Sequence, residues 1–307
     1  MPGLAPVGQL PTGRIVELPG RGSTYVVDSG PVPGAPTFVL LHGAAATGLM
    51  MWYPALEMMR GFGRVVVFDQ RWHGQGISSP RFSLEDCADD VAALADALGV
   101  DTFVPVGYSM GSLVAQVVWY RHRERLEGLV LGAAATGWWN GVTWERIGAG
   151  VMAALIEALS PRPGVSAAAA SNAESSVGNN LQWMLGQVRS TSLGGIARAV
   201  AEITRFDSTS WVGTIDVPTA VLIPLHDRAI PPRHQFWLAK QIPEAHIVTV
   251  DGGHTCCVLQ YDKFVPALQE AVDSVRQRIA PAAENIATES LGATHRRRDR
   301  HAALNPP

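Results

Sequence analysis

A serine between two glycines is the residue of this sequence whose type and setting most directly suggest chemistry. The sequence Gly-Tyr-Ser-Met-Gly at 107–111 follows a strand-like apolar run at 102–106 and precedes a helix-like run at 112–120. A G-x-S-x-G pattern between strand and helix predicts a sharp turn that lifts a serine hydroxyl into a cleft. The first backbone N–H groups of such a helix have no partner within the helix, and they point toward an oxyanion that forms beside the serine. The pattern therefore predicts Ser109 as a nucleophile and the Met110 N–H as an oxyanion donor.

A serine hydroxyl near neutral pH needs a general base beside it, and that base needs an orienting acid. The candidate base is His254, in an Asp-Gly-Gly-His sequence that directly follows a strand-like run at 246–250. The two glycines let this loop fold over the carboxyl end of a sheet. His226 and His234 flank the candidate acid and are expected to be structural or exposed. The other histidines after the serine lie in a helix end, at a strand start or in the tail: His122, His246, His295 and His301.

The candidate acid is Asp227, which follows a strand-like run at 219–225. A carboxylate at the carboxyl end of a parallel strand points into the crevice that the serine turn also faces. Asp69 follows a strand too, but it precedes the serine and so violates the chain order serine, acid, histidine. Asp251 is only three residues from the candidate base. The alternative acid position, after the run at 128–131, is occupied by alanines at 133–135.

The second oxyanion donor is expected in the loop His-Gly-Ala-Ala-Ala-Thr-Gly at 42–48, after the first buried strand. Its small residues let the backbone approach a substrate, and a plain tight turn is the alternative interpretation. Ala44 is the first candidate donor and Ala45 the second. His42 precedes the serine and is expected to brace the loop rather than to act as the base.

Apolar runs without alternation, separated by helical stretches, must position these residues. Two N-terminal runs at 14–18 and 24–28 predict an antiparallel hairpin. The clearest helix is 83–98, where Ser83 and Asp86 fit a capping arrangement. The buried strands are predicted at 37–41, 64–68, 103–106, 128–131, 219–223 and 246–250. This alternation predicts an α/β fold with a doubly wound, mostly parallel sheet.

One interval carries no strong strand signal and predicts a helical cap inserted over the sheet. The cap is expected at 136–216, and the core at 1–135 and 217–278. The tryptophans of the cap either pack its helices against the sheet or line an apolar pocket. Trp138, Trp139 and Trp183 are the candidate pocket residues. The tail at 279–307 is expected to be disordered, with its basic cluster solvated.

Composition bounds the class of protein. The chain has 307 residues, 47% hydrophobic and 17% charged, which is ample material for a core. A net charge of −3 argues against a nucleic-acid binder. The three cysteines have no metal-ligand spacing, and no metal or cofactor is implied. No signal peptide or membrane span is visible, so a cytoplasmic protein is expected, and a homo-oligomer is left open.

In combination these motifs resemble the α/β-hydrolase superfamily, and most closely its branch of capped esterases, lactonases and C–C hydrolases. The motifs are His42-Gly43, Asp69-x-Arg71-x-His73-Gly74-x-Gly76-x-Ser78, Gly107-x-Ser109-x-Gly111, the Asp227 loop and Gly253-His254. The resemblance implies Ser109 as nucleophile, His254 as base and Asp227 as acid, with Ala44 and Met110 as oxyanion donors. Two residues depart from the pattern: Trp72 stands where the superfamily often has glycine, and Pro105 interrupts the strand before the serine.

These residues predict a cofactor-free serine hydrolase that cleaves a carboxylic ester, with an apolar acyl or ring-containing group, through an acyl-enzyme. Serine at position 109 excludes a dehalogenase, which needs aspartate there. Hydrolysis of an enol-lactone or a C–C bond, cofactor-free haloperoxidation and acyl transfer remain open. The alternative of a different class is a non-catalytic protein that binds a small apolar ligand on the same fold.

Overall fold

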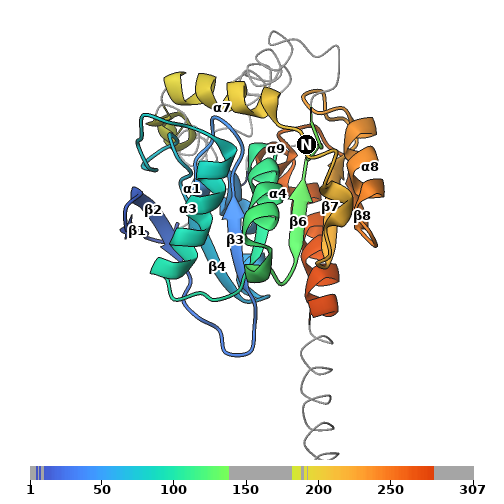
Figure 1. The fold of residues 1–307 in the computed structure, drawn as a ribbon, viewed down its shortest axis with the longest axis horizontal. Helices are drawn as coiled ribbons and strands as arrows, with labels where there is room; N and C mark the ends of the chain where they lie inside the picture. The colour runs from blue at the N-terminus through green and yellow to red at the C-terminus, as the bar shows by residue number, and fades with distance from the viewer. Residues whose placement is uncertain are drawn as a thin grey trace, which may run out of the picture.

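The computed structural model describes residues 10–137, 182–187, 190–191 and 193–279, together with Ala5 and Val7. These residues contain an eight-stranded sheet in the order β1-β2-β4-β3-β5-β6-β7-β8 (Figure 1). The strands are β1 Arg14–Leu18, β2 Gly22–Asp28, β3 Thr37–Leu41, β4 Arg64–Phe68, β5 Val104–Tyr108, β6 Leu129–Gly132, β7 Thr219–Pro224 and β8 His246–Val250. The β1–β2 hairpin is antiparallel and joins β4 in antiparallel fashion, whereas all later pairs are parallel. The prediction of a mostly parallel sheet is confirmed.

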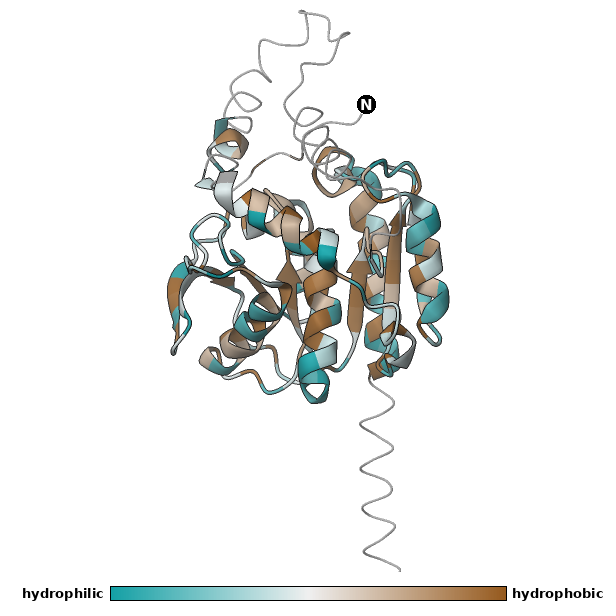
Figure 2. Ribbon diagram, turned by 45° about the horizontal axis from the view of Figure 1, so that its top comes forward, coloured by the Kyte–Doolittle hydropathy of each residue, from teal (hydrophilic) through white to brown (hydrophobic). Residues whose placement is uncertain are grey.

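Helices cover both faces of the sheet, as the continuous apolar strands require. They are α1 Gly48–Trp52, α2 Leu56–Arg60, α3 Leu84–Ala97, α4 Met110–His122, α7 Leu193–Arg205, α8 Pro232–Gln241, α9 Cys256–Leu259 and a helix over 261–279. Short 3-10 turns occupy Tyr53–Ala55, Arg123–Arg125 and Val212–Thr214. One apolar core lies under α3, α4 and α8, and a second lies under α1, α2, α9 and the helix over 261–279. Figure 2 shows apolar residues concentrated along the strands between these layers.

Helix α3 begins where the sequence predicts it. The Ser83 side chain accepts the backbone N–H of Asp86 over 3.0 Å, which satisfies one of the free donors of the first turn. Leu84, Val91 and Leu94 are buried on the face that packs against the sheet. The helix thereby joins the same apolar core as α4, the helix that follows the serine.

Pro105 lies in β5, a central strand, where proline usually removes a sheet hydrogen bond. The Phe103 N–H donates to the Arg125 oxygen over 2.9 Å, so the nitrogen of Pro105, two residues later, faces the same side. Regular pairing on that side begins only at Val106, opposite Val130. The missing N–H of Pro105 therefore removes no hydrogen bond between β5 and β6.

Within the predicted cap, the described residues 182–187 and α7 are helical, whereas 206–216 form turns, an isolated bridge from Asp207 to Gly137 and the 3-10 turn at Val212–Thr214. Figure 1 shows α7 lying across one end of the sheet. The domain boundaries themselves stay a prediction. The predicted tail lies outside the described residues except for Ile279, which ends the helix over 261–279. Within the described part of the chain, no helix is long and apolar enough to span a membrane.

Candidate active site

Ser109 stands on a strained turn between β5 and α4, with φ 55° and ψ −120°. This region of backbone space is costly for any residue with a Cβ, and such strain gathers at functional sites. The flanking glycines are sterically required. A Cβ on Gly107 would lie 2.2 Å from the Gly111 oxygen, and one on Gly111 would lie 2.1 Å from the Leu41 oxygen. The crossing of strand and helix therefore excludes larger residues at both positions.

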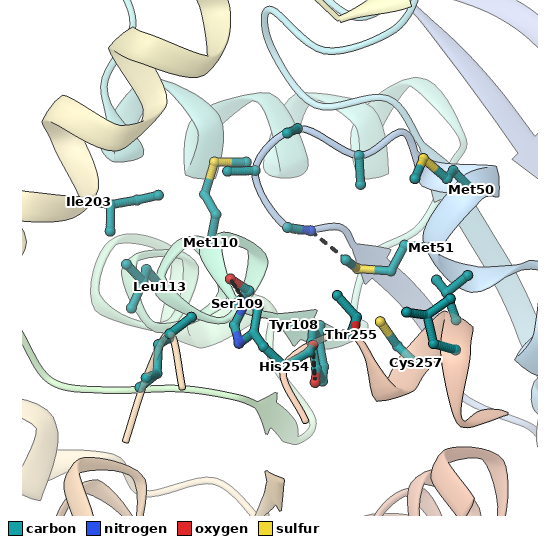
Figure 3. A pocket seen from close by; sticks show the side chains of 18 of the residues that line it. Met50, Met51, Tyr108, Ser109, Met110, Leu113, Ile203, His254, Thr255 and Cys257 are labelled. Atoms are coloured by element: carbon teal, nitrogen blue, oxygen red, sulfur yellow. Dashed lines mark hydrogen bonds between the residues drawn. The ribbon is translucent and has the colours of Figure 1, made fainter. Parts of the chain in front are cut away.

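Three side chains from separate loops form one hydrogen-bonded chain. His254 Nε2 lies 3.0 Å from Ser109 Oγ, and His254 Nδ1 lies 2.8 Å from Asp227 Oδ2. Figure 3 shows His254 beside Ser109 at the floor of a cavity. The loop that carries the histidine is held by Tyr108, whose hydroxyl donates to the His254 oxygen over 2.9 Å. The structure thus brings together the three residues that the sequence singled out.

Electrostatics favour a protonated state of the histidine at higher pH than usual. Burial by itself lowers the pKa of His254, because it penalises the charged imidazolium. The negative charge of Asp227 and its hydrogen bond outweigh that effect, and the pKa of His254 is raised above its usual 6.5. The pair is therefore arranged to stabilise an imidazolium that forms beside Ser109.

The Asp227 carboxylate is fully buried and held by four donors. Oδ1 accepts the backbone N–H groups of Ala229 and Ile230, each over 2.8 Å. Oδ2 accepts the Gln235 side-chain amide at 3.1 Å as well as the Nδ1–H of His254. These bonds fix the carboxylate and hence the tautomer of the imidazole, with its proton on Nδ1 and a free lone pair on Nε2.

The loop after β3 approaches the serine closely. A Cβ on Gly43 would lie 3.2 Å from the Ser109 Cβ. Ala45 has φ 62°, so the loop turns sharply just after Ala44. The Met110 N–H belongs to the first turn of α4, whose donors have no partner within the helix. Ala44 and Met110, the two predicted oxyanion donors, both line the cavity around the serine.

His42 braces this loop from below. Its Nδ1–H donates to the Gly43 oxygen at 2.8 Å, and its Nε2 accepts the Gln70 N–H at 2.9 Å. Complete burial lowers the pKa of His42 to about 4, so the ring is neutral. His73 packs edge-on against it at 5.1 Å between ring centroids, and burial lowers the pKa of His73 to about 3.

The cavity above the serine is almost entirely apolar. Its polar side chains among the described residues are Tyr108, Ser109, His254 and Thr255, and no charged side chain of the described residues lines it. Four methionines contribute to the wall: Met50, Met51, Met110 and Met184. Unbranched thioether side chains fill irregular apolar space and adapt to different ligands. The arrangement suits an uncharged, apolar organic group.

The sequence predicts three tryptophans in the substrate pocket, and the structure describes one of them. Trp138 and Trp139 lie outside the described residues. The Trp183 ring packs edge-on against Tyr53 at 5.4 Å, whereas its neighbour Met184 lines the cavity. A contact of Trp183 with substrate stays a prediction. Sequence reasoning missed the methionines, although two of them directly follow the predicted oxyanion loop.

No cluster of metal-ligating side chains is present in the described ranges. The other departure from the superfamily pattern, Trp72, has φ 65°, a value that favours glycine. Its ring lies under the Arg198 guanidinium of α7, at 4.5 Å from the centroid. The tryptophan therefore joins the loop after β4 to the helix above the cavity.

Comparisons with known proteins agree with the fold. A family model described as the alpha/beta hydrolase fold matches residues 36–147. The chain is 23% identical over 260 residues to 3-oxoadipate enol-lactonase 1 of Acinetobacter baylyi, covering 83% of this chain and 96% of the relative. A solved hydrolase from Pseudomonas aeruginosa superposes with a TM-score of 0.68 at 24% identity, over 86% of this chain and 99% of that one. An enol-lactonase from Burkholderia xenovorans superposes with a TM-score of 0.67 at 24% identity, over 85% and 100%.

The family model covers β3 to β6, and with them the loop at 42–48 and the serine turn. The solved structures match this chain over nearly their full length. The sequence matches and the shared topology lead to one assignment. The chain has the α/β-hydrolase fold.

Proposed function

We propose that this protein is a serine hydrolase that cleaves an uncharged carboxylic ester through an acyl-enzyme. The observation that carries the proposal is the continuous hydrogen-bonded chain from Ser109 through His254 to Asp227, at the floor of an apolar cavity. A serine, a base and an orienting acid in this geometry perform acyl transfer on several unrelated folds. No cofactor is needed for the reaction.

In the acylation step, Ser109 Oγ attacks the ester carbonyl carbon while its proton passes to His254 Nε2. The carbonyl π electrons move to the oxygen, and the resulting oxyanion accepts hydrogen bonds from the backbone N–H groups of Ala44 and Met110. When the tetrahedral intermediate collapses, the C–O bond to the leaving group breaks. The proton on Nε2 moves to the leaving oxygen, which gives the alcohol and an ester on the serine. Asp227 stays ionised and stabilises the imidazolium.

Water then reverses the sequence. His254 Nε2 takes a proton from a water molecule as the water oxygen attacks the acyl carbon, and the same N–H groups receive the oxyanion. Collapse breaks the bond to Ser109 Oγ, which takes the proton back from the histidine. The products are a carboxylic acid and the free enzyme.

The cavity wall supports an apolar substrate. A substrate with a free carboxylate would need a cationic partner once it is desolvated, and the described part of the wall supplies none. A second candidate is hydrolysis of a neutral enol-lactone, because a lactone is an internal ester and the full-length relative is named as an enol-lactonase. The chemistry of the three residues is the same for both.

The cysteines support a reducing compartment. Cys87, Cys256 and Cys257 are all free and buried, and burial raises the pKa of Cys256 to about 12, which keeps its thiol unreactive. Because structural disulfides are absent from the described residues, we propose a cytoplasmic enzyme.

The test compares wild type with Ser109→Ala on short p-nitrophenyl esters, neutral lactones and esters that carry a free carboxylate. We expect wild type to prefer the neutral substrates and Ser109→Ala to lose activity by at least about 10³-fold. A fluorophosphonate probe should label Ser109 in the folded wild type. Ester hydrolysis by Ser109→Ala at the wild-type rate contradicts the proposal, and a folded wild type that the probe cannot label favours a non-catalytic binding protein.

A further inference from the structure

Gly43, which lies against the nucleophile, has an unusual hydrogen-bond acceptor. Its N–H donates to the Met51 Sδ over 3.2 Å, within the wall of the cavity (Figure 3). We infer that Met51 is a positioning residue, whose thioether sets the direction of the Ala44 N–H through the backbone of Gly43. The inference rests on the proposed function, in which the Ala44 N–H receives the oxyanion.

The two peptide groups that flank Gly43 are hydrogen-bonded at every polar atom except one. The His42 oxygen accepts the side-chain amide of Gln70 at 2.6 Å. The Gly43 oxygen accepts the imidazole Nδ1–H at 2.8 Å and the Ala46 N–H at 3.4 Å. The Gly43 N–H has the thioether as its acceptor. Among the described residues no acceptor takes the remaining group, the Ala44 N–H, which is therefore free for a ligand in the cavity.

Met51 is held rigidly enough to act in this way. It lies in α1, and its own N–H donates to the Thr47 oxygen over 3.2 Å. The first residue of that helix, Gly48, donates its N–H to the buried Asp69 carboxylate at 2.8 Å. The Met51 side chain is itself buried. Helix α1 and the end of the loop at 42–48 are thus tied to the Asp69 carboxylate at the end of β4, which holds the Met51 backbone in place.

A glycine at position 43 makes this acceptor necessary. Without a Cβ, glycine rotates about its backbone bonds with little steric restraint, so hydrogen bonds must define the orientation of its peptide groups. If the thioether is removed, the buried Gly43 N–H has no partner, and the peptide turns to find one. The neighbouring Ala44 N–H moves with it. Stabilisation of an oxyanion depends steeply on the direction of its donors, so the rate of acylation falls.

Met50 provides a matched comparison, because it lies in the same helix, is equally buried and lines the same cavity. Among the described residues its sulfur accepts no backbone N–H. Leucine has nearly the volume of methionine but offers no acceptor. Met51→Leu and Met50→Leu therefore make the same change of side chain in the same helix, and only Met51→Leu removes the hydrogen bond to Gly43.

The experiment measures kcat and KM for both variants with a p-nitrophenyl ester, together with the amide chemical shift and hydrogen exchange of ¹⁵N-glycine-labelled protein without substrate. We expect kcat of Met51→Leu to fall about tenfold below that of Met50→Leu, with similar KM values. The Gly43 amide should shift and exchange faster in Met51→Leu alone. Met51→Gln, whose amide oxygen is an acceptor, should recover part of the lost kcat.

Equal kcat values for the two leucine variants, within twofold, overturn the inference, as does a Gly43 amide that Met51→Leu leaves unchanged. Failure of the proposed function gives a different result. In that case Ser109→Ala retains hydrolysis, while the amide signals, which need no substrate, still decide whether Met51 orients the loop.

Discussion

The guanidinium carbon of Arg198 lies 4.5 Å from the centre of the Trp72 ring. The contact joins α7, which contributes Ile203 to the cavity wall, to the loop that follows β4. The tryptophan is held with φ 65° against the ordinary preference of a residue with a Cβ. This pair is therefore a tether that sets how α7 covers the cavity.

Loss of the contact between Arg198 and Trp72 should weaken substrate binding more than it slows the chemical steps. A cation–π contact of this kind contributes about 0.5–2 kcal/mol, so we expect Arg198→Ala to raise KM for longer acyl esters about two- to tenfold. The kcat for a short acetyl ester should change by less than about twofold, because the serine and histidine lie in other elements. Steady-state kinetics with a series of p-nitrophenyl esters measures both.

Arg205→Ala is the control for this comparison, since Arg205 lies in the same helix but pairs with its neighbour Glu202 at the surface. A rise in KM of the same size in both variants would show that α7 responds to any loss of charge and not to the contact with Trp72.

The pH dependence of activity should reflect the histidine. His254 must be neutral to accept the serine proton, and its pKa is raised above 6.5. We therefore expect kcat/KM to fall as the pH is lowered, with a midpoint above pH 6.5. In Asp227→Asn the stabilising charge is lost, so the midpoint should move to lower pH and kcat should fall on the order of 10³–10⁴-fold. An acid limb that Asp227→Asn leaves in place would assign the titration to another group.

The buried histidine pair should make the protein sensitive to acid. The pKa values of His42 and His73 are lowered to about 4 and about 3, whereas histidines in an unfolded chain titrate near 6.5. The unfolded state therefore binds more protons as the pH falls below 6.5, and the free energy of unfolding falls with it. Between pH 7 and pH 5 we expect a loss of about 2 kcal/mol for each histidine, measured by urea unfolding.

His42→Gln removes the titratable imidazole at position 42 and leaves an amide that can still form hydrogen bonds near the loop at 42–48. Its stability at pH 7 should be lower, but the further loss between pH 7 and pH 5 should be about half that of wild type. A wild type whose unfolding free energy is constant over this range would refute the linkage.

Strain at the nucleophile gives a further prediction. Ser109 has φ 55° and ψ −120°, a conformation that glycine adopts freely. Ser109→Gly should therefore be more stable than Ser109→Ala by about 1 kcal/mol, although both are inactive. Thermal unfolding of the two variants, side by side, measures the difference. Equal stability would mean that the turn relaxes when the hydroxyl is lost.

Much of this arrangement could be predicted from the sequence, because the elements concerned have strong local signals. The runs at 37–41 and 64–68 coincide with the buried strands β3 and β4, whereas the run at 246–250 forms the edge strand β8. Only Val248 and Val250 are buried in β8, so the prediction of a buried strand there is wrong. Apolar runs of this length and composition are stable only between two helical layers. The proximity of His254 and Asp227 to the serine followed from chain order and from the rule that active sites lie at the carboxyl ends of parallel strands.

The wall of the cavity could not be predicted in the same way. Met50 and Met51 look like ordinary core residues in the sequence, because a buried cavity wall and a packed core have the same composition. Trp183 carried a stronger aromatic signal and its ring packs against Tyr53, while its neighbour Met184 lines the cavity. Which side of a helix faces a cavity depends on tertiary packing that no local pattern encodes.

The four methionines of the cavity wall have a consequence for evolution of the substrate range. Met51 is held by its hydrogen bond to Gly43, but Met50, Met110 and Met184 each have three rotatable side-chain bonds and a polarisable sulfur, so their part of the wall can be reshaped by rotamer changes at little energetic cost. A wall of branched and less flexible side chains would fit acyl groups of one shape and exclude acyl groups of other shapes. This enzyme should instead show plasticity, hydrolysing a broad set of neutral acyl groups at comparable rates and gaining selectivity through single substitutions of methionine by isoleucine or phenylalanine.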